Sequence, residues 1–198
     1  MAFPIVMMSG LIGTGKSTTA RRIQRACRQN GQDYVIVSGT SSRVELGIRV
    51  YDRKDCCKVQ AHMFHKTIDA LNSGKGVIID AIHHRSWNDK TGGRRRVYEF
   101  ARKEGIALLL CETVCSRDLA RKRISERVMV PGVFCDTNDP TRYDFVRAEQ
   151  DPIVFDLEDY YFSYVTFNTE SEVLTKKIVL PEASGLVSII EEELCPKK

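Results

Sequence analysis

The sequence contains no hydrophobic run that approaches the roughly 20 apolar residues of a membrane-spanning helix, because its apolar stretches are only strand-sized. Its first residues, Met1 to Phe3, lead directly into such a stretch. They show neither the basic segment nor the cleavage site of a secretory signal. We therefore expect a cytoplasmic protein with no membrane partner.

Cysteine is present, but not in patterns that bind metal or build a disulfide framework. The seven cysteines are an odd number, and they stand singly except for the adjacent pair Cys56 and Cys57. No Cys-x-x-Cys pair and no Cys/His grouping with zinc spacing occurs. Reduced thiols, typical of a cytosolic protein, are the expected state.

An excess of one charge is also missing. The net charge of +4 is too small to indicate a nucleic-acid-binding protein by itself. No stretch combines aromatic and basic residues into a stacking platform. Nucleic acid is therefore a partner that the sequence allows but does not favour, and the oligomeric state stays unknown.

What the sequence does contain is an alternation of short apolar segments with amphipathic ones. We expect strands at 4–9, 34–37, 76–81, 106–111 and 164–167, helices at about 15–30, 56–72, 97–103 and 118–127, and a further strand at 177–180 and helix at 186–194. Strands that alternate with helices form a parallel sheet covered on both sides. We predict a three-layer α/β fold with a five-stranded parallel sheet, built as one domain over residues 1–198 because no repeat or linker divides the chain.

The most specific signal is a glycine-rich loop between the first strand and the helix after it. Residues 10–17 read Gly-Leu-Ile-Gly-Thr-Gly-Lys-Ser and match the phosphate-binding pattern G-x-x-x-x-G-K-[ST]. Gly10, Gly13 and Gly15 allow backbone N–H groups to point at phosphate oxygens. The dipole of the following helix adds to the attraction. The loop predicts a nucleotide-binding P-loop protein.

Polar side chains of the same segment are expected to hold the nucleotide and its metal ion. The pattern predicts that Lys16 reaches the β- and γ-phosphates and that the Ser17 hydroxyl binds Mg²⁺. Thr14 and Thr18 lie beside them and are assigned to the nucleotide as well. The predicted cofactors are therefore ATP and Mg²⁺.

Asp80 is the carboxylate that we expect to act beside this loop. It ends the apolar strand segment 77–79, so its side chain should emerge at the carboxyl edge of the sheet, where ligands bind in open α/β folds. There it could bind Mg²⁺ together with Ser17, act as general base on an acceptor hydroxyl, or do both. Alternatively, Asp80 only caps the turn that follows the strand.

The segment after the second strand, 38–43, matters because it carries no acid before Glu45. Kinases that act on a hydroxyl often place an aspartate there as base. Either Asp80 takes that role, or the acceptor is a phosphate that needs no base. Thr40 and Arg43 are expected to contact the acceptor, with Arg43 binding an anionic group.

Basic residues farther along the chain are candidates for contacts with phosphates. Arg123 and Arg127 are four residues apart on a predicted helix and therefore on one face. From a lid at about 117–139 they could neutralise charge on the transferred group, or they could belong to a solvated lid exterior. Arg94 and His83 could reach the acceptor, and a structural hydrogen bond is the competing role for His83.

Four segments resemble the kinase domain of 6-phosphofructo-2-kinase within the P-loop kinase superfamily, with polynucleotide 5′-kinases as relatives. They are the phosphate loop at 10–17, the segment at 37–43, Ile-Asp-Ala-Ile-His at 79–83, and Leu-Cys-Glu-Thr-Val-Cys at 110–115. The likeness extends loosely over nearly the whole chain, and only the phosphate loop is specific on its own.

The resemblance implies a role for several side chains. Lys16 and Ser17 would bind ATP and Mg²⁺, and Asp80 would be the key carboxylate. Arg43 would meet a phosphate of the acceptor, and Cys115 would line the nucleotide pocket.

These patterns predict an ATP-dependent phosphotransferase of the P-loop kinase type that transfers the γ-phosphoryl group to a small, phosphorylated metabolite. A nucleotide or polynucleotide 5′-hydroxyl is the second candidate for the acceptor. A regulatory ATPase or switch belongs to another class and needs no acceptor. The sequence has neither the base-recognition motif Asn-Lys-x-Asp nor an AAA-type extension.

Overall fold

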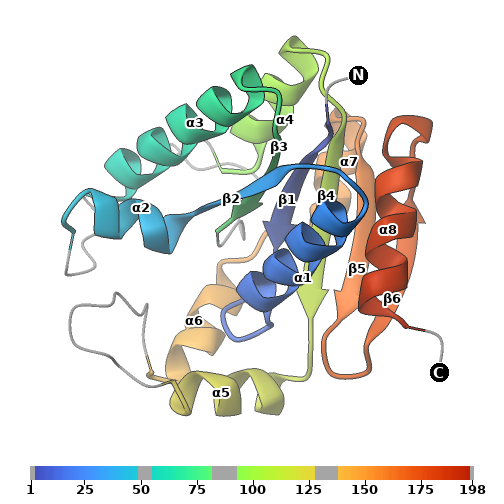
Figure 1. The fold of residues 1–198 in the computed structure, drawn as a ribbon. Helices are drawn as coiled ribbons and strands as arrows, with labels where there is room; N and C mark the ends of the chain where they lie inside the picture. The colour runs from blue at the N-terminus through green and yellow to red at the C-terminus, as the bar shows by residue number, and fades with distance from the viewer. Residues whose placement is uncertain (1–2, 49–54, 82–92, 128–137, 197–198) are drawn as a thin grey trace.

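The computed structural model describes residues 3–48, 55–81, 93–127 and 138–196, and a six-stranded sheet with the order β2-β3-β1-β4-β5-β6 forms its centre (Figure 1). The strands are β1 (Ile5–Ser9), β2 (Tyr34–Ser38), β3 (Gly76–Asp80), β4 (Leu108–Val114), β5 (Ser163–Asn168) and β6 (Val173–Ile178). Strands β1 to β5 run parallel, and β6 pairs antiparallel with β5. The predicted α/β class is confirmed, with an antiparallel edge strand added to the five parallel ones.

Strand β6 begins four residues before the segment predicted for it. The reason is a short turn, in which the side-chain oxygen of Asn168 accepts hydrogen bonds from the N–H groups of Glu170 at 2.9 Å and Ser171 at 3.1 Å. This turn reverses the chain directly after β5. A strand that follows so short a connection must run antiparallel to its neighbour.

Helices cover both faces of the sheet. They are α1 (Lys16–Gln29), α2 (Gly39–Glu45), α3 (Cys56–Asn72), α4 (Arg95–Lys103), α5 (Arg117–Ser125), α6 (Thr141–Ala148), α7 (Asp156–Asp159) and α8 (Ser184–Leu194). Figure 1 shows α1 and α8 on one side of the strands and α3 and α4 on the other. We call these two sides the α1 face and the α3 face.

The alternation of side chains along β1 divides the core between the two faces. Val6 and Met8 pack in a buried cluster with residues of α1 and α8, such as Ile23 and Ile190. Ile5 and Met7 join the cluster on the opposite face with residues of α3 and α4. Because β1 is buried on both faces, its sequence is a continuous apolar run rather than an alternating one.

Other predicted segments also differ from the structure. Segment 38–43 is not an open loop but the end of β2 followed by α2, since the Ser38 hydroxyl caps the helix by accepting a hydrogen bond from Ser41 N at 3.0 Å. Helix α5 ends at Ser125. Arg127 therefore lies beyond the helix, and the prediction that Arg123 and Arg127 share one helical face is wrong.

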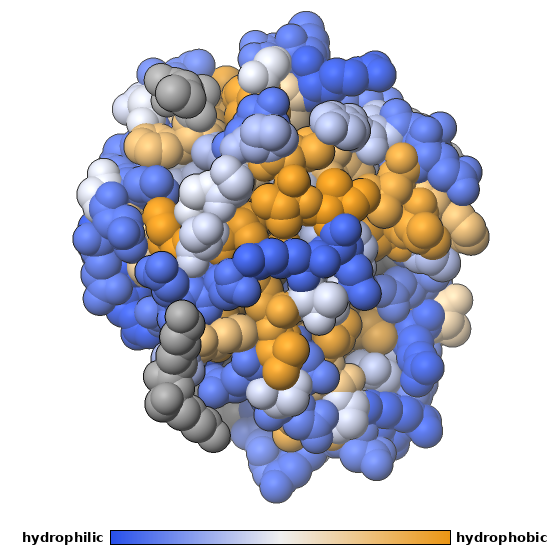
Figure 2. All heavy atoms as spheres, turned by 90° about the vertical axis from the view of Figure 1, so that its right-hand side faces the viewer, coloured by the Kyte–Doolittle hydropathy of each residue, from blue (hydrophilic) through white to orange (hydrophobic). Residues whose placement is uncertain are grey.

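The side of the molecule formed by β6 and α8 is partly apolar. Figure 2 shows hydrophobic atoms gathered on this side and crossed by a hydrophilic band. Val173 in β6 is 53% exposed, and Val179 just after the strand is 36% exposed. Within the described residues, no helix combines the length and apolar character needed to span a membrane.

Candidate active site

The loop between β1 and α1 adopts a backbone conformation that depends on its glycines. The φ angles of Gly10, Gly13 and Gly15 are +130°, +83° and +94°, in a region that residues with a Cβ rarely occupy. A tight turn closes inside the loop, since the Thr14 hydroxyl donates to Leu11 O at 2.7 Å. The loop is thus closed by a turn of its own in front of α1.

Neighbouring backbone crowds two of these glycines. A Cβ on Gly13 would lie 2.5 Å from the carbonyl oxygen of Ala120 in α5, and one on Gly10 would collide with the carbonyl oxygen of Thr113. The obstacles are main-chain atoms, so a side chain could not be accommodated by a rotamer change. The conformation of the loop is therefore held from outside as well as by its own turn.

Gly13→Ala should lower the affinity for Mg²⁺–ATP by at least about tenfold, because the loop must move away from α5 to make room for the methyl group. The matched control is Gly31→Ala, where φ is also positive at +71° but nothing lies within 4 Å of the added Cβ. Both variants should lose about 1–2 kcal/mol of stability from the left-handed backbone. Only Gly13→Ala should lose affinity in calorimetry, and equal affinities would contradict this account of the loop.

The amino end of α1 is arranged to bind an anion. Its N-cap is Gly15, which offers no side-chain hydrogen bond, and no acidic residue occupies the first turn. The first N–H groups of a helix have no partner inside it and attract negative charge. Lys16 is only 8% exposed, and its Nζ donates to Leu11 O at 2.7 Å, while Ser17 and Thr18 are exposed beside it. These features fit the phosphates of a nucleotide.

Two threonines far away in the sequence support the loop. The Thr113 hydroxyl lies 2.8 Å from the Thr14 hydroxyl, and the Thr169 hydroxyl donates to Thr14 O at 2.9 Å. Thr113 belongs to β4 and Thr169 follows β5. Sequence reasoning missed both, because no local pattern distinguishes a threonine that meets a loop about 100 or more residues away.

Arg123 lies beside the loop through one of these threonines. Its guanidinium donates to the Thr169 hydroxyl at 2.8 Å and to Thr169 O at 3.3 Å. Cys115 lies nearby, where burial raises the pKa of its thiol and the positive charge of Arg123 acts in the opposite direction. Arg123 and Cys115 thus lie near the loop, and their roles toward a nucleotide stay predictions.

Apolar side chains join the loop to the helices that follow β4. Leu11 and Ile12 form a buried cluster with Ala120 and Ile124 of α5 and with Tyr143 of α6. Leu11 and Ile12, which occupy unspecified positions of the phosphate-binding pattern, therefore attach the loop to the base of the predicted lid. Residues 128–137 of that lid lie outside the described residues.

Asp80 ends β3 at the carboxyl edge of the sheet and is 8% exposed. The pairing of β1 with β3 places Met7 opposite Ile79, so Asp80 is level with Met8. Partners in a parallel sheet point to the same side. Met8 points to the α1 face, so the Asp80 side chain points to the same face of the sheet. Helix α1, which carries Ser17, covers this face.

Arg94 does not lie at the acceptor site that the sequence predicted for it. Its side chain is fully buried and pairs with the buried Asp156 at 2.5 Å, and it also donates to Asp151 O at 3.0 Å. The Tyr98 hydroxyl donates to the same carboxylate at 2.9 Å. Burial and the negative Asp156 raise the pKa of Tyr98, which keeps this hydroxyl protonated. A buried charge must be paired, so Arg94 serves the core.

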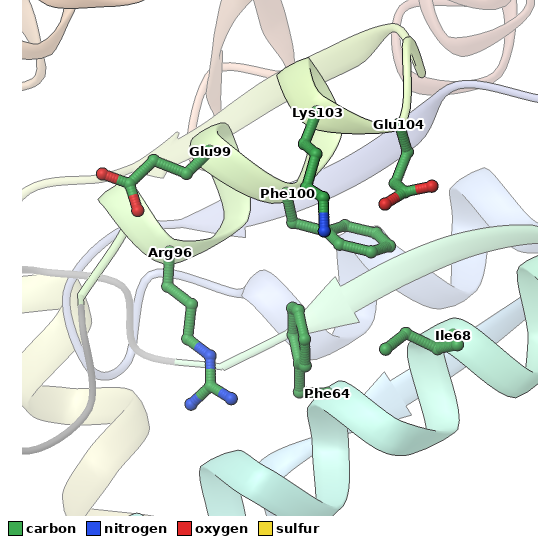
Figure 3. A pocket seen from close by; sticks show the side chains of 7 residues that line it. All are labelled: Phe64, Ile68, Arg96, Glu99, Phe100, Lys103 and Glu104. Atoms are coloured by element: carbon green, nitrogen blue, oxygen red, sulfur yellow. The ribbon is translucent and has the colours of Figure 1, made fainter.

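The neighbouring arginines are also engaged. Arg95 donates to Asp159 at 2.8 Å. The Arg96 guanidinium lies 4.4 Å from the centre of the Phe64 ring, in a cavity of about 360 Å³ between α3 and α4 (Figure 3). Figure 3 shows that Lys103, Glu99 and Glu104 border the same cavity.

Of the three remaining residues that were predicted to contact the acceptor, the structure describes two. Thr40 is exposed on α2, and Arg43 is half-buried one turn later on the same helix. His83 lies outside the described residues. Within the described parts of the chain, no three His, Cys, Asp or Glu side chains gather into a metal site.

Comparison with known proteins identifies related sequences and folds. A family model described as an AAA domain (AAA_33) matches residues 5–139. No curated protein matches the chain. The family name was not expected from the sequence, in which we found no AAA-type extension.

Solved structures share the fold at low identity. A candidate kinase of Chloroflexus aurantiacus is 19% identical, with a TM-score of 0.60 over 95% of each chain. The APS kinase CysC of Mycobacterium tuberculosis, in complex with AMPPNP and APS, is 18% identical with a TM-score of 0.51 over 80% of this chain and 98% of its own. A gluconokinase of Sinorhizobium meliloti is 16% identical with a TM-score of 0.50 over 98% of this chain and 92% of its own.

Proposed function

The chain belongs to the family described as an AAA domain, and from this premise we propose that it is an ATP-dependent phosphotransferase acting on a small, phosphorylated metabolite. The observation that carries the proposal is the loop at 10–17, with three glycines at positive φ in front of an uncapped helix that begins with Lys16. Kinases among the proteins of similar fold support the same reaction class.

ATP would lie over this loop, and Mg²⁺ would be held by Ser17 and Asp80. The loop N–H groups and the helix dipole would bind the β- and γ-phosphates, and Lys16 would add a mobile positive charge. Thr14 and Thr18 complete the proposed nucleotide site. Arg123 lies beside the loop, from where it would neutralise charge on the transferred group, and Arg127 would act from the lid.

The acceptor would bind at the carboxyl edge on the α3 face. The residues proposed to contact it are Thr40 and Arg43, which belong to α2, and His83, which follows Asp80 in the chain. Arg43 would bind the phosphate group of the metabolite. The 6-phosphofructo-2-kinase resemblance makes fructose 6-phosphate the first acceptor to test.

The test is an acceptor panel with radiolabelled ATP. The panel contains fructose 6-phosphate, D-gluconate, AMP and an oligonucleotide with a 5′-hydroxyl, and the product is labelled acceptor rather than free phosphate. Transfer to fructose 6-phosphate supports the proposal, whereas transfer to gluconate alone supports a phosphotransferase but contradicts the phosphorylated acceptor. ATP consumption that yields only free phosphate with every acceptor contradicts it.

Asp80→Asn tests the proposed metal ligand. We expect the Mg²⁺ concentration for half-maximal rate to rise at least about tenfold and kcat to fall by about 100- to 1,000-fold, because a neutral amide binds the cation weakly. The control is Asp33→Asn, since Asp33 is 60% exposed and pairs only with Lys75 at 3.3 Å among the described contacts. The measurement is the reaction rate as a function of Mg²⁺ concentration at a fixed ATP concentration. An unchanged Mg²⁺ dependence would exclude Asp80 from the metal site.

A regulatory ATPase is the second candidate, because the matched family is described as an AAA domain. Such a protein would hydrolyse ATP at the same rate with and without the acceptors of the panel. Its rate would change instead on addition of a protein partner. The labelled-product assay therefore separates the two candidates.

A further inference from the structure

A second acidic residue lies at the carboxyl edge of the sheet, next to the phosphate loop. Glu112 belongs to β4 and is directly opposite Ser9, the last residue of β1 before the loop begins. Adjacent strands are about 4.8 Å apart. Glu112 is half-buried, so its carboxylate is near the loop and still open to a ligand.

Glu112 points to the opposite face from Asp80. Cys111 packs in the cluster of the α1 face, and successive side chains of a strand alternate. Glu112, the next residue, therefore points to the α3 face. Asp80 lies on the α1 face with Ser17, as the strand register requires. The two carboxylates thus flank the end of β1 on different sides of the sheet.

The carboxylate of Glu112 is held in one orientation by its neighbours on β5. The Tyr164 hydroxyl donates a short hydrogen bond to Glu112 Oε2, and the Thr166 hydroxyl donates to Tyr164 at 3.3 Å. Burial and the adjacent carboxylate raise the pKa of Tyr164, so the phenol stays a donor. No hydrogen bond to the other oxygen, Oε1, is formed within the described residues.

Two of the proposed acceptor residues belong to a helix that packs against α3. Helix α2, with Thr40 and Arg43, precedes α3 and packs against it. The arginines at 94–96, which could have surrounded the acceptor with positive charge, are bound to Asp156, Asp159 and the Phe64 ring. Glu112, opposite the last residue of β1, is thus an acid next to the loop on this side.

We propose that Glu112 binds a hydroxyl group of the acceptor through Oε1, with Tyr164 as the residue that positions the carboxylate, so that the acceptor receives the phosphoryl group on a hydroxyl rather than on a phosphate. This inference rests on the proposed phosphotransferase function and names its acceptor class. An ionised carboxylate accepts a hydrogen bond from a hydroxyl. It repels a phosphate acceptor at the same place.

The experiment compares Glu112→Gln, Tyr164→Phe and Glu99→Gln in the acceptor panel. Glu99 is the matched control, because it also accepts a hydrogen bond from a tyrosine, Tyr160 at 3.2 Å, but is exposed on α4. Fructose 6-phosphate, gluconate and the 5′-hydroxyl oligonucleotide are the hydroxyl acceptors, and AMP is the phosphate acceptor. Each variant is measured for acceptor KM, kcat and the KM for Mg²⁺–ATP.

With a hydroxyl acceptor, Glu112→Gln should raise the acceptor KM about 10- to 100-fold, the effect of losing a hydrogen bond to a charged group. Tyr164→Phe should raise it about three- to tenfold, because the carboxylate remains but is no longer oriented. The KM for Mg²⁺–ATP should stay within about twofold in both variants, which a general loss of structure would not permit. Glu99→Gln should behave as wild type.

Each other outcome overturns a distinct claim. If hydroxyl acceptors are phosphorylated and Glu112→Gln leaves their KM unchanged, the role of Glu112 is wrong and the phosphotransferase function stands. If only AMP is phosphorylated, the hydroxyl acceptor class is wrong. If no acceptor is labelled, the proposed function fails, and the inference fails with it. Should Glu112→Gln not fold, Tyr164→Phe decides by the same KM comparison.

Discussion

Lys16→Ala is expected to reduce phosphoryl transfer at least about 100- to 1,000-fold, the cost of removing one preorganised charge from a transition state. Lys16 is 8% exposed, and its ammonium group is held over the loop by Leu11 O. In the proposed reaction it would follow the negative charge that moves onto the leaving β-phosphate. The measurement is single-turnover transfer from radiolabelled ATP.

The control for this variant is Lys58→Ala, which removes a lysine that is 71% exposed and pairs with Asp55 on the surface of α3. It should retain wild-type activity, because an exposed pair contributes about 1 kcal/mol or less. Circular dichroism should show both variants folded. If Lys16→Ala kept more than a tenth of the wild-type rate, the loop at 10–17 would not be the site of transfer.

Arg94→Ala and Asp156→Ala are each expected to lower the free energy of unfolding by about 3–5 kcal/mol, because either change leaves an uncompensated charge in the core. Both side chains are fully buried, and Tyr98 donates to the same carboxylate. A loss of this size is a large part of the stability of an ordinary domain. Urea unfolding followed by tryptophan fluorescence or circular dichroism measures it.

The double variant Arg94→Met/Asp156→Leu should recover much of this loss, since an apolar pair of similar volume carries no buried charge. The comparison variant is Arg95→Ala, whose partner Asp159 is 53% exposed and whose loss should cost less than about 1 kcal/mol. A stable Arg94→Ala variant with a raised acceptor KM would instead return Arg94 to the acceptor site, as the sequence first suggested.

Local patterns predicted the elements well. Helix α3 has the predicted bounds, because its apolar spacing and its terminal residues are properties of one continuous segment. The phosphate loop was predicted equally well, since its glycines and Lys16 belong to one short segment whose backbone conformation depends on those glycines. The end of α5 and the start of β6 were misjudged, because a C-terminal turn and a hairpin depend on contacts beyond the segment.

The α/β fold class and the position of the glycine-rich loop could be predicted from the sequence, because both follow from residues that are close together in the chain. The sequence did not predict that Arg94 belongs to the core with Asp156, that Thr113 and Thr169 support the loop, or that Glu112 and Asp80 point to opposite faces. Those relations depend on strand register and on burial. Strand order and packing between distant segments set both, and no short pattern encodes either.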